Sequence, residues 1–221
     1  MKKLVGVLLV LVVSVCITPD SYGFGLGGLK KVTGGGSGGT DWAAMSKQSD
    51  SALADLYAGQ SQLSDAVADL ADVVGLKEQA AELRGHVANL QKCGSSSCSS
   101  FSEIQKSDDS VTKATLEKLK SVDNLTAEQK KKASAAMKKY IKGGILYAKG
   151  LKDVKILSKK AMDAPAMQKI KFAGLIKAAP VAGKGAGNIL QTAPTLFKLA
   201  TAKDIEYPED AKSEMMSSLT M

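Results

Sequence analysis

The single histidine of this 221-residue chain, His86, limits the catalytic and metal chemistry that can be expected. It stands beside Leu83, Val87 and Leu90 on one face of an expected helix, a position typical of packing. A serine and an acid could join it only through tertiary contacts, which spacing along the chain does not reveal. A lone histidine also lacks the partners that helical metal sites need. We therefore predict no catalytic residue, no metal and no cofactor, and expect a protein that is not an enzyme.

Two cysteines, Cys93 and Cys98, are the next residues with chemistry of their own. Four small residues, Gly94-Ser95-Ser96-Ser97, separate them. Redox-active pairs usually have two intervening residues, so this spacing favours a structural disulfide that holds the end of a helix. Such a bond requires an oxidising compartment.

Residues 183–187 read Gly-Lys-Gly-Ala-Gly and superficially resemble a phosphate-binding loop. The Gly-Lys-Ser/Thr ending is missing and no strand precedes the segment, so we expect no phosphate site there. Nucleic-acid recognition is not expected either, because Arg84 is the only arginine and aromatic residues make up 5% of the chain. Base readout and base stacking depend on those residue types.

An apolar segment rich in small residues, 172–202, is the strongest candidate for a ligand site. In one interpretation it closes a helical core, and in the other it lines a groove for a lipid-like molecule whose anionic headgroup lies on lysine. The predicted ligand-binding residues are Leu175, Ile176, Ile189, Leu190, Leu196 and Phe197. We rank carriage of a hydrophobic ligand first among the specific functions.

Charge is distributed unevenly along the chain, whose net charge is +8. Residues 41–91 hold eight acids and three bases, whereas residues 127–163 hold eleven lysines and three acids. The two segments can be neighbours that neutralise each other. Alternatively, a basic surface docks an anionic partner, such as a membrane surface or an acidic envelope protein. The lysines expected on one helical face are Lys131, Lys138, Lys142 and Lys149.

The N-terminal residues indicate export. Two lysines precede an apolar run at 4–17, and small residues precede Phe24, so we predict a signal peptide over 1–23 and a periplasmic or secreted protein. An uncleaved N-terminal anchor is one alternative. A lipoprotein beginning at Cys16 is another, although the valine before it fits that processing poorly. A Gly-rich flexible linker is expected over 24–39.

Helical periodicity dominates the remainder, and an apolar fraction of 44% suits a folded domain. An apolar stripe that includes Gln60 in its register predicts one long helix or two, kinked or turned near Gly75. A capping box over Thr126 to Gln129 begins a lysine-rich helix, which we expect to bend or break at 150–153.

Further helix ends are predicted from capping residues and prolines. Thr40 and Asp163 are expected N-caps, and Pro180 and Pro194 are expected interruptions. Small residues at four-residue spacing, Ala179, Gly183 and Gly187, predict a close helix approach.

No segment alternates with the period of a strand. The sequence therefore predicts an all-α antiparallel bundle of about five helices over residues 40–210, followed by a mobile tail at 211–221. The sequence leaves the oligomeric state open, because a long apolar stripe serves a bundle core or a coiled-coil dimer equally well.

Overall fold

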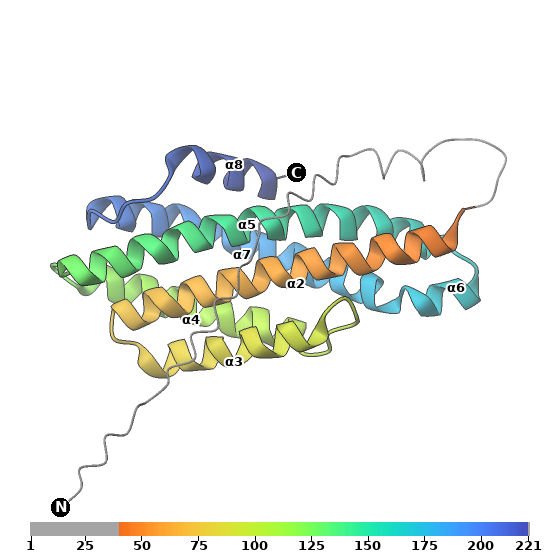
Figure 1. Ribbon diagram of the computed structural model, residues 1–221, viewed down its shortest axis with the longest axis horizontal. Helices are drawn as coiled ribbons and strands as arrows, with labels where there is room; N and C mark the ends of the chain where they lie inside the picture. Colours follow the sequence, from red (N-terminus) through yellow and green to blue (C-terminus); the bar gives the residue numbers. More distant parts are fainter. Residues whose placement is uncertain (1–39, 221) are drawn as a thin grey trace, which may run out of the picture. The chain divides into compact units, whose positions relative to one another are not determined.

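Helices account for the regular structure of the described chain (Figure 1). The computed structural model describes residues 40–220, and all of these except Thr40 belong to a compact unit that begins at Asp41. Its helices are α2 (Trp42–Val73), α3 (Lys77–Cys93), α4 (Phe101–Ser121), α5 (Ala127–Met162), α6 (Ala166–Lys171), α7 (Ala173–Ala202) and α8 (Glu209–Leu219). The all-α prediction is confirmed, and the short helices α6 and α8 are additions to the five long ones. The predictions for 1–23, Cys16 and 24–39 lie outside the described residues.

The two longest helices, α2 and α5, pack side by side and run antiparallel (Figure 1). Gly59 of α2 lies against Tyr147 of α5, and Gly150 of α5 lies against Leu56 of α2. A Cβ on either glycine, or on Gly143 of α5, would come within 3.0 Å of backbone atoms of the partner helix. These missing side chains therefore allow the two backbones to approach closely.

Helix starts and turns follow local chemistry. The side chain of Asp41 accepts hydrogen bonds from two backbone N–H groups of the first turn of α2, so the N-cap lies one residue after the predicted Thr40. Gly75 has a φ of +85° in the turn between α2 and α3, which confirms the predicted turn. Thr126 and Gln129 form the predicted capping box at the start of α5.

The helices are not broken at the three positions where interruptions were predicted. Helix α5 continues through residues 150–153, and α7 continues through both Pro180 and Pro194. Each proline removes one N–H donor from the helix, but both are exposed on its outer side. The inner side, with Ala182 and Ala193 fully buried, keeps its packing, and this tertiary packing holds α7 together.

The connections after α5 also differ from the prediction. Asp163 is the C-cap of α5, and Pro165 is the N-cap of α6. Most of the expected tail at 211–221 belongs to α8, where Met215 and Leu219 are buried. Burial of these two apolar side chains against the core favours the helix over a mobile end.

The predicted close approach at Gly183 and Gly187 is wrong. A Cβ on either residue would meet no atom within 4 Å, whereas Gly185 lies against Gln105 and Tyr147. Gly185, which contacts the core, therefore lies in the sequence between Gly183 and Gly187, the two glycines that the four-residue spacing had indicated.

Candidate functional site

The apolar residues predicted to bind a ligand all lie on α7, where the structure divides them into two groups. Leu175, Leu196 and Phe197 are 1–2% exposed, and Ile176, Ile189 and Leu190 are half-buried and pack against the same core. The ring of Phe197 packs between Tyr140 and Tyr207, at centroid distances of 6.3 and 5.2 Å. The first group therefore serves the interior of the bundle.

Only one of these residues, Ile189, lines the small cavity between α2, α4, α5 and α7. The cavity has a volume of about 40 Å³, and the polar side chains Gln60, Ser64 and Asp108 form part of its wall. A space of this size suits a few water molecules. Pockets for drug-sized ligands usually have volumes of roughly 300–1,000 Å³.

A larger hollow of about 350 Å³ lies open to solvent where α7 leads into α8. Three of its residues, Asp204, Glu206 and Glu209, carry carboxylates. None of the six predicted ligand residues lines it. Its acidic lining does not favour an anionic headgroup.

Polar side chains around the small cavity form a buried hydrogen-bonded cluster. Asp108 of α4 accepts at Oδ2 from Gln60 Nε2 of α2 at 2.5 Å, and from the hydroxyl of Ser64, one turn further along α2. Gln105 of α4 donates to Gln60 Oε1 at 3.3 Å. Because each buried donor has an acceptor, the cluster joins α2 to α4 without an unpaired amide.

Tyr147 of α5 extends this cluster to α7. Its hydroxyl accepts from Gln105 Nε2 at 2.7 Å and donates to the backbone carbonyl of Ala182 at 2.8 Å. Burial raises the pKa of Tyr147 well above its ordinary value, so the hydroxyl remains a donor at neutral pH.

His86 of α3 faces the second oxygen of Asp108. The distance from His86 Nδ1 to Asp108 Oδ1 is 3.8 Å, and neither buried atom has a hydrogen-bond partner within residues 40–220. Hydrogen bonding to Asp108 would raise the pKa of His86, burial of the ring lowers it, and the charges of Asp108 and Glu82 raise it further. The net effect is a raised pKa, although 3.8 Å is longer than a hydrogen bond.

The order of Ser64, Asp108 and His86 differs from that of a nucleophile triad. In a triad the histidine lies between the serine and the acid and removes the hydroxyl proton. Here the acid lies between them, and the Ser64 hydroxyl donates to Asp108. This arrangement orients side chains and links helices, and it is not the hydrogen-bond order of a Ser-His-acid triad.

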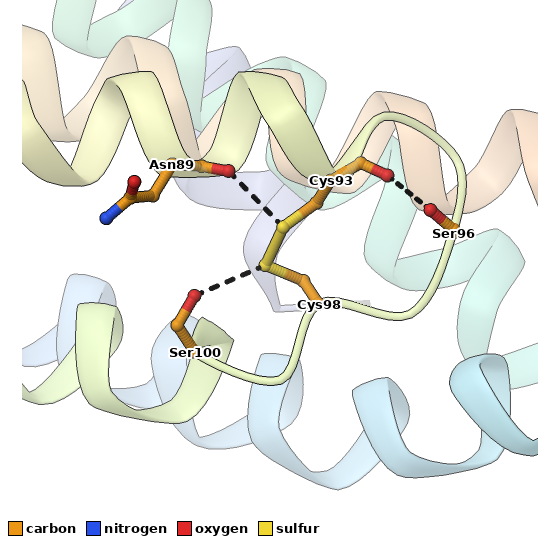
Figure 2. Close-up of a disulfide and its surroundings, with 5 residues drawn as sticks. All are labelled: Asn89, Cys93, Ser96, Cys98 and Ser100. Atoms are coloured by element: carbon orange, nitrogen blue, oxygen red, sulfur yellow. Dashed lines mark hydrogen bonds between the residues drawn. A yellow bond between two sulfur atoms is a disulfide. The ribbon is translucent and has the colours of Figure 1, made fainter.

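Cys93 and Cys98 form a disulfide, as predicted, with their Cα atoms 5.3 Å apart (Figure 2). Cys93 is the last residue of α3, and Cys98 lies shortly before the start of α4. Ser96, inside the loop, donates to the carbonyl of Cys93 at 2.7 Å (Figure 2). The bond therefore closes the turn between the two helices.

The predicted lysine face lies on α5, but its members differ in their partners. All four are exposed: Lys131, Lys138, Lys142 and Lys149. Lys149 Nζ lies 3.0 Å from Asp55 Oδ2. The other three form no ion pair with a carboxylate of the described chain.

Acidic groups of α2 are engaged by other bases. Lys139 Nζ lies 2.6 Å from carboxylate oxygens of both Asp65 and Asp69, and Arg84 pairs with Asp69 and Asp72. The acidic and basic segments are thus neighbours that partly neutralise each other. Positive charge that remains on α5 includes the three unpaired lysines of this face.

Residues 183–187 lie inside α7, which is not the strand-to-helix turn of a phosphate-binding loop. Within residues 40–220, no three His, Cys, Asp or Glu side chains are grouped so that they could hold a metal ion. None of the helices described is both long and apolar enough to cross a membrane.

Two features were missed by sequence reasoning. The buried cluster of Gln60, Ser64, Gln105 and Asp108 had one signal, a glutamine in an otherwise apolar helical stripe. The exposed apolar residues at α6 had none, because a short amphipathic segment does not show which side is covered.

Comparison with protein-family models, with curated proteins and with solved structures finds no match.

Proposed function

We propose that the protein is exported and acts as a non-enzymatic adaptor that docks an anionic partner through the exposed lysines of α5. The observation that carries this proposal is that Lys131, Lys138 and Lys142 are exposed and form no ion pair with a carboxylate of residues 40–220. Neighbouring bases such as Lys139 are held by α2 carboxylates. A cluster of unpaired charge on one face attracts a partner of opposite sign over about a Debye length, ~8 Å at physiological salt.

The disulfide supports the export component of the proposal. A bond between Cys93 and Cys98 suits an oxidising compartment, where small loop-closing disulfides persist. The signal peptide expected over residues 1–23 agrees with such a location.

Docking is favoured over carriage of a lipid-like ligand because the bundle interior is nearly filled. Leu175, Leu196 and Phe197 pack in the core, and the cavity that Ile189 lines measures about 40 Å³. An acyl chain would have to displace these side chains, and each large buried apolar residue contributes about 2 kcal/mol or more.

The proposal is tested with heparin as a polyanionic probe. We expect Lys138→Glu combined with Lys142→Glu to elute from immobilised heparin at clearly lower salt than the parent protein. The matched control is Lys113→Glu with Lys120→Glu, which makes the same change in net charge on α4. Both control lysines are exposed, and their pairs with Asp109 and Glu117 lie at the surface.

The comparison of the two variants decides the outcome. A larger effect of the α5 pair locates the docking face on that helix. Equal shifts for both pairs would show that only net charge matters, and the α5 face would then be rejected.

A further inference from the structure

Large exposed apolar side chains of the described chain gather at one corner of the bundle. They are Met162 at 52% exposure, Met167 at 78% and Ile170 at 74%. Met162 ends α5, and the other two lie on α6, the short helix that joins α5 to α7 at one end of the bundle (Figure 1). We call these three residues the α6 corner. Contiguous exposed apolar residues usually mark a surface that meets a partner.

The chain holds this corner outward by anchoring both of its ends. Ala164 and Phe172, which flank α6, are 4% and 1% exposed, whereas no residue of α6 itself is buried. Met167 and Ile170 are three residues apart, so they project from the same face of the helix. The two apolar side chains therefore protrude from a fixed position.

Positive charge surrounds the corner. Residues 159–171, around the corner, contain four lysines and a single acid, Asp163. Lys169 and Lys171 of α6 and Lys159 of α5 are exposed, and none of them pairs with a carboxylate of residues 40–220. An apolar tip with a lysine border is complementary to a surface that is negative outside and apolar beneath.

An anionic bilayer has that layered chemistry. Apolar side chains enter the boundary between headgroups and acyl chains, and lysines bind anionic headgroups while their stems cover apolar surface. A protein partner would need an interface of about 1,000 Å² or more. Three side chains on a protruding corner offer less than that, whereas a bilayer adapts to a small convex tip.

We infer that the α6 corner docks the protein onto an anionic lipid surface by inserting Met162, Met167 and Ile170 among the headgroups. Lys159, Lys169 and Lys171 then lie at headgroup level. This inference does not rest on the lysine face of α5, because the two surfaces share no residue.

The first test measures co-sedimentation with vesicles of phosphatidylglycerol and phosphatidylcholine, and with vesicles of phosphatidylcholine alone. We expect the parent protein to bind the anionic vesicles. Met167→Ser combined with Ile170→Ser keeps every charge, and it should weaken that binding about tenfold or more. The circular dichroism spectrum should not change, because neither side chain is buried.

A charge variant provides the second arm. Lys169→Glu with Lys171→Glu should weaken vesicle binding more than Lys113→Glu with Lys120→Glu, which changes the net charge equally on α4. Trp42 is the only tryptophan, so Met167→Trp in a Trp42→Phe background gives a single fluorophore at the corner. Its emission should be quenched by brominated lipid.

Several outcomes would overturn the inference. These are absence of binding to anionic vesicles, full binding by the serine variant, equal effects of the two charge variants, or unquenched emission from the vesicle-bound Met167→Trp variant. The parent protein could instead self-associate and bind no vesicles. If the serine variant then lost that self-association, the corner would be an interface with a second copy of the chain. Elution of the serine variant from heparin should match the parent protein, so failure here and failure of the α5 proposal are distinguishable.

Discussion

Asp108 is the residue on which the buried polar cluster depends. Gln60 and Ser64 donate to one of its oxygens, and His86 of a third helix faces the other. Removing one partner of a buried charge costs about 3–5 kcal/mol, because the remaining group is left uncompensated. The cluster therefore opposes any change in the relative positions of α2, α3 and α4.

The raised pKa of His86 predicts that stability decreases as pH rises. The protonated ring is favoured in the folded protein, so its contribution is complete below the ordinary pKa of 6.5 and is lost as pH rises through the raised folded value. We expect the free energy of unfolding from urea titrations to fall as pH rises above about 6.5. His86→Asn should remove this fall.

Asp108→Asn is the matched variant for the same measurement. The amide oxygen of an asparagine can still accept from Gln60 and Ser64, and its NH₂ group can donate to a neutral His86. We expect a folded protein that lacks the pH dependence contributed by this pair. An undiminished dependence in both variants would show that the contact between His86 and Asp108 has no energetic effect.

At the scale of the elements, the contact between α2 and α5 makes Gly59 sensitive to substitution. A Cβ at Gly59 would lie within 3.0 Å of backbone atoms of Tyr147, so α5 would have to shift. We expect Gly59→Ala to lower the free energy of unfolding by about 1–3 kcal/mol. The measurement is urea denaturation followed by far-ultraviolet circular dichroism.

Gly85→Ala is the control, because Gly85 also lies inside a helix, α3, and a Cβ there meets nothing within 4 Å. Alanine should stabilise α3 by roughly 0.5–1 kcal/mol, since it loses less backbone entropy than glycine in a helix. If both substitutions changed the free energy of unfolding in the same direction, the result would contradict the tight packing of α2 on α5.

Helix type and several helix ends could be predicted because they depend on neighbouring residues. The capping box at Thr126 is an example, since both of its hydrogen bonds join residues three apart. The continuity of α7 could not be predicted, because Pro180 and Pro194 disfavour a helix locally and distant packing overrides them. Gly185 illustrates the same limit, since only the tertiary fold places Gln105 and Tyr147 beside it.

At the scale of the molecule, the distribution of charge depends on which lysines find a carboxylate. Lys138 and Lys139 are adjacent in the sequence, yet Lys139 pairs with Asp65 and Asp69 while Lys138 faces solvent. Lysine spacing predicted an exposed face but could not assign these pairings, which depend on the register of α2 against α5. Of the predicted face, Lys149 is the member that the α2 acid Asp55 neutralises.

The proposed export and the disulfide together predict the covalent form of the mature protein. Removal of residues 1–23 leaves Cys93 and Cys98 as the only cysteines, and their bond lowers the mass by two hydrogen atoms. We expect the intact mass of protein recovered from the periplasm or medium to match a chain that begins at Phe24 and does not react with thiol reagents unless reduced. A chain beginning at Cys16 with attached acyl groups would identify a lipoprotein instead. Free thiols in the untreated protein would contradict the oxidised form on which the proposed compartment depends.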